Sequence, residues 1–486
     1  MIRRQLLHVE VYGAESDGVA LQHRLPELCR ISLSPAIEQA MMGIVPAHEH
    51  LIIDRIDIDV GTLKLEHLER DLAEAVIHAL AKQLREQVTP AGVTTEGRQR
   101  RSNHQAVHDA LLHFLRTGNL PWWFHLSAGQ TLEQLIRASW KTVGQTAAAW
   151  SHFVDGLSDT LCVEAARKRL VLQFSPEFLE ILLVSLSSAS ATTLREVVAK
   201  LDSVDMAAAS RRNISKQLWQ TVVVAAAAGK ELTATTLLTE CWNALTTSEQ
   251  QEPALFTRLT KHWPEIVSQS EKKPLKQTGS ESELRRLFAS PTLQHTRSAD
   301  DDTPRRAAGI ARSEAADQLE LKEGIYIDCA GVVLLHPFLP QLFDTLGIAA
   351  EDRMLQPERA LCLLHFLATG QRVAPEYALA LPKLLCNVAL DAPVDSLLEV
   401  SVTEAEEASA LLAAVIRHWD ALGDTSADGL RGTFLLRSGK LSRRDDGDFV
   451  LQVETQSFDI LLERLPWGIG AIKLPWMHVM LWVEWH

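Results

Sequence analysis

A polar stretch past the middle of this chain most strongly limits what it can fold into. Residues 268–318 combine a segment rich in Ser, Lys and Glu with a charged run, in which three aspartates begin at Asp300 and two arginines begin at Arg305. So few apolar side chains cannot bury enough surface to offset the entropy lost when a backbone becomes ordered. We therefore predict a disordered linker over residues 268–318, with separately folded parts on either side.

The rest of the chain has enough apolar residues to build cores. Of its 486 residues, 46% are hydrophobic and 23% are charged, which is the balance of a globular protein. The formal net charge of −14 opposes nonspecific attraction to nucleic acids and to anionic membranes, so we expect neither as a partner. Six widely spaced cysteines without a CxxC pair are typical of reduced, inert thiols in a cytoplasmic protein.

Neither a targeting segment nor a membrane segment is expected. The charged residues Arg3 and Arg4 are not followed by the apolar run of a signal peptide. The most apolar run, Val222 to Ala228, is far shorter than the ~20 residues that cross a bilayer. If the protein reaches a membrane or the cell exterior, another component must carry it there.

The first 89 residues have the pattern of strand, helix, strand, helix. Apolar and polar residues alternate over residues 7–11 and again over residues 52–60, which is typical of half-buried strands. Helical spacing of apolar residues follows each of them, over residues 20–42 and 65–84. We expect a small α+β domain over residues 1–89 in which the two strands pair.

Two further domains are predicted. Residues 105–267 carry helix-length apolar patterns and at most one strand, over residues 170–174, so we expect a helical bundle or an irregular solenoid. Residues 319–486 mix helices with strands, such as a helix over residues 357–369 and a strand over residues 449–454. The predicted fold class is α+β and predominantly helical, with an α+β N-terminal domain, a helical middle and a mixed C-terminal domain.

One eight-residue pattern occurs twice. Residues 111–118 and 363–370 agree at seven of eight positions and differ only at Arg116 and Ala368. Each copy ends in the glycine that commonly terminates a helix in the left-handed conformation. The repeat indicates either a duplicated module that docks in the same way twice, or a chance similarity between two capped amphipathic helices.

Sequence signatures of catalysis and of metal binding are missing. The sequence around Lys230 lacks the glycine and the Ser or Thr of a phosphate-binding loop, and the chain has neither a G-x-S-x-G nor an HExxH motif. His48 and His50 lack a third ligand nearby. Asp57 and Asp59 share a strand face without a ligand-rich loop, so a solvated or partner-facing edge explains them better than a cation site. We predict no enzyme, no cofactor and no metal site.

Several blocks in the C-terminal third follow one another in a recognisable order. Residues 329–339 read CAGVVLLHPFL, residues 381–386 read LPKLLC, and two Leu-Pro-Trp turns lie at residues 465–467 and 474–476. These blocks resemble the tape measure protein family of contractile injection systems, which are phage-tail-like particles with a sheath, an inner tube and a baseplate. The resemblance covers residues 325–486, part of residues 1–89, and a tryptophan block within residues 112–123.

The resemblance implies a structural protein that governs the length of the tube and sheath. Its partners would be tube, baseplate or cap proteins, with assembly in the cytoplasm and either release from the particle or retention in it. A ruler of this kind works extended, ideally as a long helix that rises ~1.5 Å per residue. The chain has no long uninterrupted helical pattern. A compact baseplate, tube-tip or cap adaptor, or an assembly chaperone, fits at least as well.

Tryptophans are the strongest candidates for contact residues. Four of them lie within residues 467–485, and all but Trp485 are directly beside Pro, Val or Leu. They are predicted either to pack in a hydrophobic core or to form a protein–protein interface, where tryptophan anchors commonly dominate the binding energy. The full set of candidate interface or core residues is Trp122, Trp123, Pro466, Trp467, Pro475, Trp476, Trp482 and Trp485.

Overall fold

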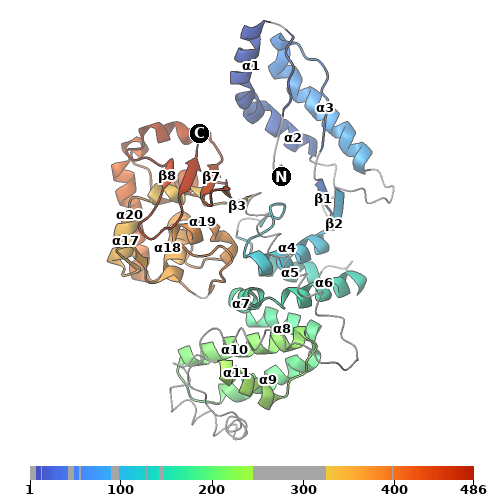
Figure 1. Ribbon diagram of the computed structural model, residues 1–486, viewed down its shortest axis with the longest axis vertical. Coiled ribbons are helices and arrows are strands. Elements are labelled where there is room, and N and C mark those ends of the chain that lie inside the picture. Colours follow the sequence, from blue (N-terminus) through green and yellow to red (C-terminus); the bar gives the residue numbers. More distant parts are fainter. Residues whose placement is uncertain are drawn as a thin grey trace, which may run out of the picture. The chain divides into compact units, whose positions relative to one another are not determined.

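The computed structural model forms two compact units and is mostly helical (Figure 1), which confirms the predicted α+β, predominantly helical class. The first unit comprises residues 1–110 and 123–145, and the second comprises residues 111–122 and 146–486. The predicted linker at residues 268–318 lies outside the described part of the chain. The described residues are 7–12, 14–41, 49–53, 56–88, 98–126, 129–141, 147–244, 324–396 and 398–485.

Helices α2 (Ser34–Met41) and α3 (Leu68–Val88) and the π-helical turn before α2 (Cys29–Leu33) build the apolar core of the first unit. Helix α1 (Glu15–Leu28) continues through this turn into α2, and the turn and α2 pack with α3. The break between α1 and α2 follows from proline at position 35, which is tolerated in the first turn of a helix but not in its interior. On α3 the buried residues of this core recur every four residues. The full set is Leu33 of the π-helical turn, Ile37 of α2, and Leu72, Val76, Leu80 and Leu84 of α3.

The strands of the first unit differ from the prediction. Strand β1 (Glu49–Ile53) pairs antiparallel with β2 (Arg98–Ser102), whereas residues 7–12 and 56–60 belong to no strand. Leu7, Val9 and Val11 are 41–45% exposed, while the alternating apolar residues of 56–60 are half-buried against the helical core. At residues 56–60 the alternation therefore marked an extended segment whose apolar side faces the helices, and a strand and a chain that lies over helices share this pattern.

Six helices make up the first part of the second unit. The single strand that the sequence allowed at residues 170–174 is instead the end of α7, where Leu170 and Phe174 are buried. Helix α10 packs against α6 to α9 and against α11, because its apolar run from Val222 to Ala226 lies largely inside. The helices are α6 (Ala147–Thr160), α7 (Glu164–Gln173), α8 (Pro176–Leu186), α9 (Ser188–Asp202), α10 (Ala208–Ala227) and α11 (Ala234–Ala244).

The C-terminal part of the second unit combines a mixed sheet with helices, shown from yellow to red in Figure 1. Its strand order is β3-β6-β7-β9-β8, and every neighbouring pair is antiparallel except the parallel pair β7 and β9. Side chains alternate between buried and exposed along β7 and β9, so one sheet face covers the core. The strands are β3 (Ile325–Ile327), β6 (Gly439–Arg443), β7 (Phe449–Val453), β8 (Ala471–Ile472) and β9 (Leu481–Glu484).

Helix α18 (Pro357–Thr369) lies at the centre of this part and is buried over most of its length. It packs with α19 (Ala380–Leu385), with α20 (Val402–His418) and with the 3-10 segment Ala330–Leu335. Two short helices, α17 (Leu339–Thr345) and α21 (Ala427–Leu430), and the small hairpin of β4 (Ala349–Ala350) and β5 (Arg353–Met354) complete it. Among the described residues, the apolar core here draws on residues 325–485 and on none of the helices before residue 245.

Candidate functional site

The two Leu-Pro-Trp turns attach the C-terminal segment to the helical core. Trp476 is buried, stacks on Phe343 at 5.5 Å between ring centroids, and donates from Nε1 to the Leu385 carbonyl at 2.8 Å. Trp467 is half-buried and donates to the Leu334 carbonyl at 3.0 Å. Each indole therefore uses its apolar ring for packing and its N–H for a backbone acceptor. The preceding residues of the two turns, Pro466 and Pro475, are exposed.

The last two tryptophans lie in strand β9 and directly after its end. Trp485 is buried, and its Nε1 donates to Asp459 at 3.1 Å beneath the guanidinium of Arg437. Trp482 is 39% exposed on the outer face of the sheet. The structure thus places Trp485 in the core and leaves the ring of Trp482 accessible from solvent.

The earlier pair of tryptophans is half-buried. Trp123 packs edge-to-face with Phe124 at 5.9 Å, and the neighbouring Pro121 is buried. Trp122 belongs to the second compact unit and Trp123 to the first. Contact of any of the eight candidate residues with another protein stays a prediction.

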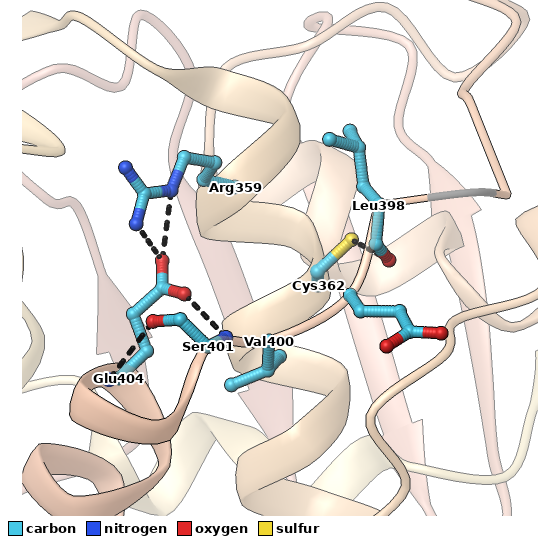
Figure 2. A pocket seen from close by; sticks show the side chains of 7 residues that line it. Arg359, Cys362, Leu398, Val400, Ser401 and Glu404 are labelled. Carbon is cyan, nitrogen blue, oxygen red and sulfur yellow. Dashed lines mark hydrogen bonds and ion pairs between the residues drawn. The ribbon is translucent and has the colours of Figure 1, made fainter. Parts of the chain in front are cut away.

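A pocket of about 180 Å³ lies where α20 begins beside α18 (Figure 2). Three of its polar side chains, Arg359, Ser401 and Glu404, are paired with one another or with backbone. Ser401 Oγ accepts from the Glu404 amide and Glu404 Oε2 accepts from the Ser401 amide at 2.8 Å, which is a capping box. Glu404 Oε1 also accepts from two nitrogens of Arg359, at 2.8 and 2.6 Å. The pocket is lined by Arg359, Cys362, Leu398, Glu399, Val400, Ser401 and Glu404.

Two titratable side chains of this pocket, Glu404 and Cys362, have shifted pKa values. Burial acts to raise the pKa of Glu404, but hydrogen bonds from Ser401 and the Arg359 guanidinium outweigh it and lower that pKa. Burial and nearby carboxylates raise the pKa of the Cys362 thiol to about 11, and its Sγ donates to the Leu398 carbonyl. An ionised, fully paired carboxylate and a protonated thiol supply neither a proton donor nor a strong nucleophile near neutral pH.

The sequence candidates for cation binding do not come together. Asp59 accepts a hydrogen bond from the amide of Gly61 at 2.8 Å, so it serves a turn whose glycine has φ of 68°. His48 lies outside the described residues. Within the described ranges, no three or more His, Cys, Asp or Glu side chains are grouped to hold a metal ion. Nor does any helix in those ranges have the length and apolarity to cross a bilayer.

A buried polar network, which we call the polar junction, joins α7 and α10 to residues 376–396. At its centre the Glu376 carboxylate accepts from Arg169 Nε at 2.9 Å and from Lys383 Nζ at 2.8 Å, with all three side chains buried. Burial lowers the pKa of Lys383, and the Glu376 carboxylate partly opposes that effect. The side chains of the polar junction are Arg169, Gln173, Lys216, Glu376, Lys383, Asp395 and Ser396.

Arg169 also terminates helix α4 (Asn103–Thr117). Its guanidinium donates to the carbonyls of Leu115 and Arg116. These carbonyls lie in the last turn of the helix, where backbone acceptors lack a donor within the helix itself. Gly118 follows with φ of 82°, and a Cβ there would lie 2.6 Å from the Glu376 carboxylate. Glycine is therefore required both for the left-handed turn and for the approach of the ion pair.

The second copy of the repeated pattern has the same geometry. Gly370 has φ of 73°, and Arg431 donates from Nε to the Leu367 carbonyl at 3.1 Å, the position equivalent to Leu115. In both copies the threonine before the glycine bonds back to the carbonyl of the pattern's histidine. Both copies are thus helix ends that receive an arginine from a separate element.

The sequence contained part of the signal for the polar junction. Lys383 lies in the block LPKLLC that suggested the family resemblance, but a carboxylate at Glu376, seven residues before this lysine, does not predict that both side chains are buried. No local pattern points to Arg169, because its partner Glu376 is 207 residues away in the chain.

Comparison with known proteins gives one match. The family model described as contractile injection system tape measure protein matches residues 1–485. No curated protein and no solved structure matches the chain. The family match extends over the helical middle, where the sequence blocks gave little resemblance.

Proposed function

This chain belongs to the contractile injection system tape measure protein family, and from that premise we propose that it governs the length of the tube and sheath of a phage-tail-like particle. The family is one of structural proteins of such particles and not an enzyme family. The observation that carries the proposal is the match itself, which spans residues 1–485. We further propose tube, baseplate or cap proteins as its partners, assembly in the cytoplasm, and no role for nucleic acid.

The chemistry of the pocket supports a non-enzymatic role. A carbohydrate-active or hydrolytic module needs a titratable pair in different protonation states, positioned beside a cleft. In the pocket of Figure 2 the carboxylate of Glu404 is paired twice and the thiol of Cys362 is held protonated. These side chains secure the start of α20 against α18, which is a structural task.

A second candidate role is that of a compact adaptor at the baseplate, tube tip or cap, or of an assembly chaperone. The observation that favours it is the length of the helices: α3, with 21 residues, is the longest among the described elements and spans about 32 Å. In this folded form the chain can measure only a distance of about the size of one domain. The two roles make different predictions for particle length.

Particle length separates these roles. Deletion of the gene should abolish particles or change their length, and restoring the gene should reverse the effect. A version that lacks about 20 residues within 268–318 should then give tubes shorter by roughly 30 Å or more if this stretch is part of a ruler. The matched control replaces the same residues by an equally long Gly/Ser sequence and should keep the original length.

Normal particles of normal length from the deletion strain would refute a structural role of either kind. Unchanged length from the shortened version, with particles lost in the deletion strain, would favour the compact adaptor. Finished particles that lack this chain would favour the chaperone. Electron microscopy of purified particles measures the length, and mass spectrometry of the same sample measures the presence of the chain.

A further inference from the structure

We propose that the polar junction is a releasable contact, which lets the chain change between its compact form and a longer form during assembly. The proposal rests on the proposed function, because a protein that gauges a tube must span more than the compact fold does. Its evidence is separate from the family match. It comes from the kind of contact that joins residues 147–244 to residues 324–485.

The parts on the two sides of the junction have cores of their own. Residues 325–485 enclose an apolar cluster to which, among described residues, no helix before residue 245 contributes. Helices α6 to α11 bury a different set of apolar side chains between themselves, among them Phe178, Val197 and Leu218. Separation at the junction would therefore leave both cores intact.

The contacts across the junction are largely polar. Gln173 accepts from the Glu376 amide at 3.0 Å and donates to the Val394 carbonyl at 2.7 Å. The Leu172 carbonyl accepts from both the amide and the hydroxyl of Ser396. Contacts within a permanent core are mainly apolar, whereas contacts between domains that move are more polar.

Charged groups strengthen this conclusion. Arg169, Glu376 and Lys383 are fully buried, so their mutual attraction must offset the loss of hydration of three charges. Near the edge, Lys216 forms an ion pair with Asp395, and both side chains are about one-fifth exposed. Water can solvate every one of these charged groups when the parts separate.

One aromatic contact also crosses the junction. Phe114 at the end of α4 packs edge-to-face with Tyr377 at 5.9 Å between ring centroids. Tyr377 directly follows Glu376, so the aromatic contact and the central ion pair depend on the same short segment. Residues 376–396 are therefore expected to leave the helices together and not one bond at a time.

Hydrogen exchange of the purified full-length chain tests this directly. The amides of Glu376 and Ser396 donate across the junction to Gln173 and Leu172. If the junction opens without unfolding, their segment should exchange at least about 100-fold faster than α18 and β7, which lie in the core of residues 325–485. If the amides at the junction and the amides of α18 and β7 were equally protected from exchange, the junction would open only by global unfolding. That result would overturn the proposal.

A pair of matched variants provides the second test. Glu376→Gln removes the charge that Arg169 and Lys383 share, while Glu399→Gln changes an exposed carboxylate outside the junction. The first should increase the maximum dimension of the chain in small-angle X-ray scattering and keep the near-ultraviolet circular dichroism of the C-terminal tryptophans. The second should change neither. Loss of the tryptophan signal in Glu376→Gln together with the expansion would show a single cooperative fold and contradict release.

Zero-length carbodiimide cross-linking tests whether the polar junction opens while particles assemble. Lys216 and Asp395 should cross-link in the purified chain, and the pair Lys230 and Glu240, at 3.4 Å on one side of the junction, provides the internal control. In assembling particles the first cross-link should fall at least tenfold relative to the second. An undiminished ratio would refute opening during assembly. The deletion phenotype is measured independently, so failure of this test leaves the proposed function standing.

Discussion

Substitution of Gly331 by alanine should strongly destabilise the C-terminal part, because the added methyl group meets backbone on the facing segment. Gly331 lies in the 3-10 segment Ala330–Leu335, within the block CAGVVLLHPFL. A Cβ at this position would lie 1.7 Å from the Phe434 carbonyl oxygen, well inside the 3.0 Å that real Cβ atoms keep. The next nearest atoms, Phe434 C and Leu435 Cα, also belong to the backbone, so no side-chain rotation relieves the overlap.

The size of the destabilisation depends on the segment that the added methyl group would displace. The π-helical segment Arg431–Leu435 would have to shift away from the core, although Phe434 and Leu435 are almost fully buried there. Overpacking of a close-packed core costs about 3 kcal/mol at the upper end of the usual range, and backbone displacement adds to it. We therefore expect Gly331→Ala to lower the free energy of unfolding by about 3 kcal/mol or more.

Gly432→Ala is the matched control, since it adds the same methyl group in the contacting segment. Nothing lies within 4 Å of a Cβ there, and alanine favours helical backbone over glycine by about 1 kcal/mol. Chemical denaturation followed by fluorescence of the buried Trp419 and Trp476 measures both variants. A Gly331→Ala protein that unfolds within about 0.5 kcal/mol of this control would refute the close approach of the two segments.

Four further outcomes are expected for the pocket and the tryptophans. Because the folded pKa of Glu404 lies below its ordinary value of 4.5, its contribution to stability is present above pH 4.5 and is lost as the pH falls through the folded pKa. The stability difference between the native protein and Glu404→Gln should thus be largest near neutral pH and shrink in acid titrations. Iodoacetamide at pH 8 should label the exposed Cys162 at least ~100-fold faster than Cys362, whose pKa of about 11 keeps it protonated; equal rates would contradict the burial of that thiol. Trp476→Phe should lower the free energy of unfolding by about 1–3 kcal/mol, because the buried Leu385 carbonyl loses its hydrogen-bond donor. Trp482→Phe should lower it by about 1 kcal/mol or less in the isolated chain, because this side chain is partly exposed. If Trp482 is an interface anchor, its alanine variant should lower the yield of particles while the unfolding midpoint stays close to that of the native protein.

The helices and strands with complete local signals could be predicted from sequence. Helix α18 covers residues 357–369 as expected, because a proline in its first turn and Gly370 after its last turn fix both ends. Strand β7 covers residues 449–453, and so it ends one residue before the predicted end at residue 454. In each case the information lies within a few residues of the element.

The partners of the strands and of the buried polar side chains could not be predicted from local sequence. Alternation over residues 7–11 and 52–60 showed extended chain with one apolar side, but it does not name a partner. The structure pairs β1 with β2, a strand rich in Arg and Gln, so its sequence carries no alternating apolar signal. The polar junction is the extreme case, since it combines residues from distant parts of the chain whose burial depends on the whole fold.

The two arginine-receiving helix ends show how one local pattern serves two kinds of contact. In the second copy, Arg431 lies over the ring of the buried Phe366 and pairs with the exposed Asp428 three residues earlier, so its carboxylate partner is local and hydrated. In the first copy, Arg169 is fully buried and depends on Glu376 from the other side of the polar junction. Separation of the parts would leave the Arg431 contact unchanged and would remove the carboxylate from Arg169. The same helix end is therefore a permanent core contact in one copy and, in the other, the point at which the chain can open.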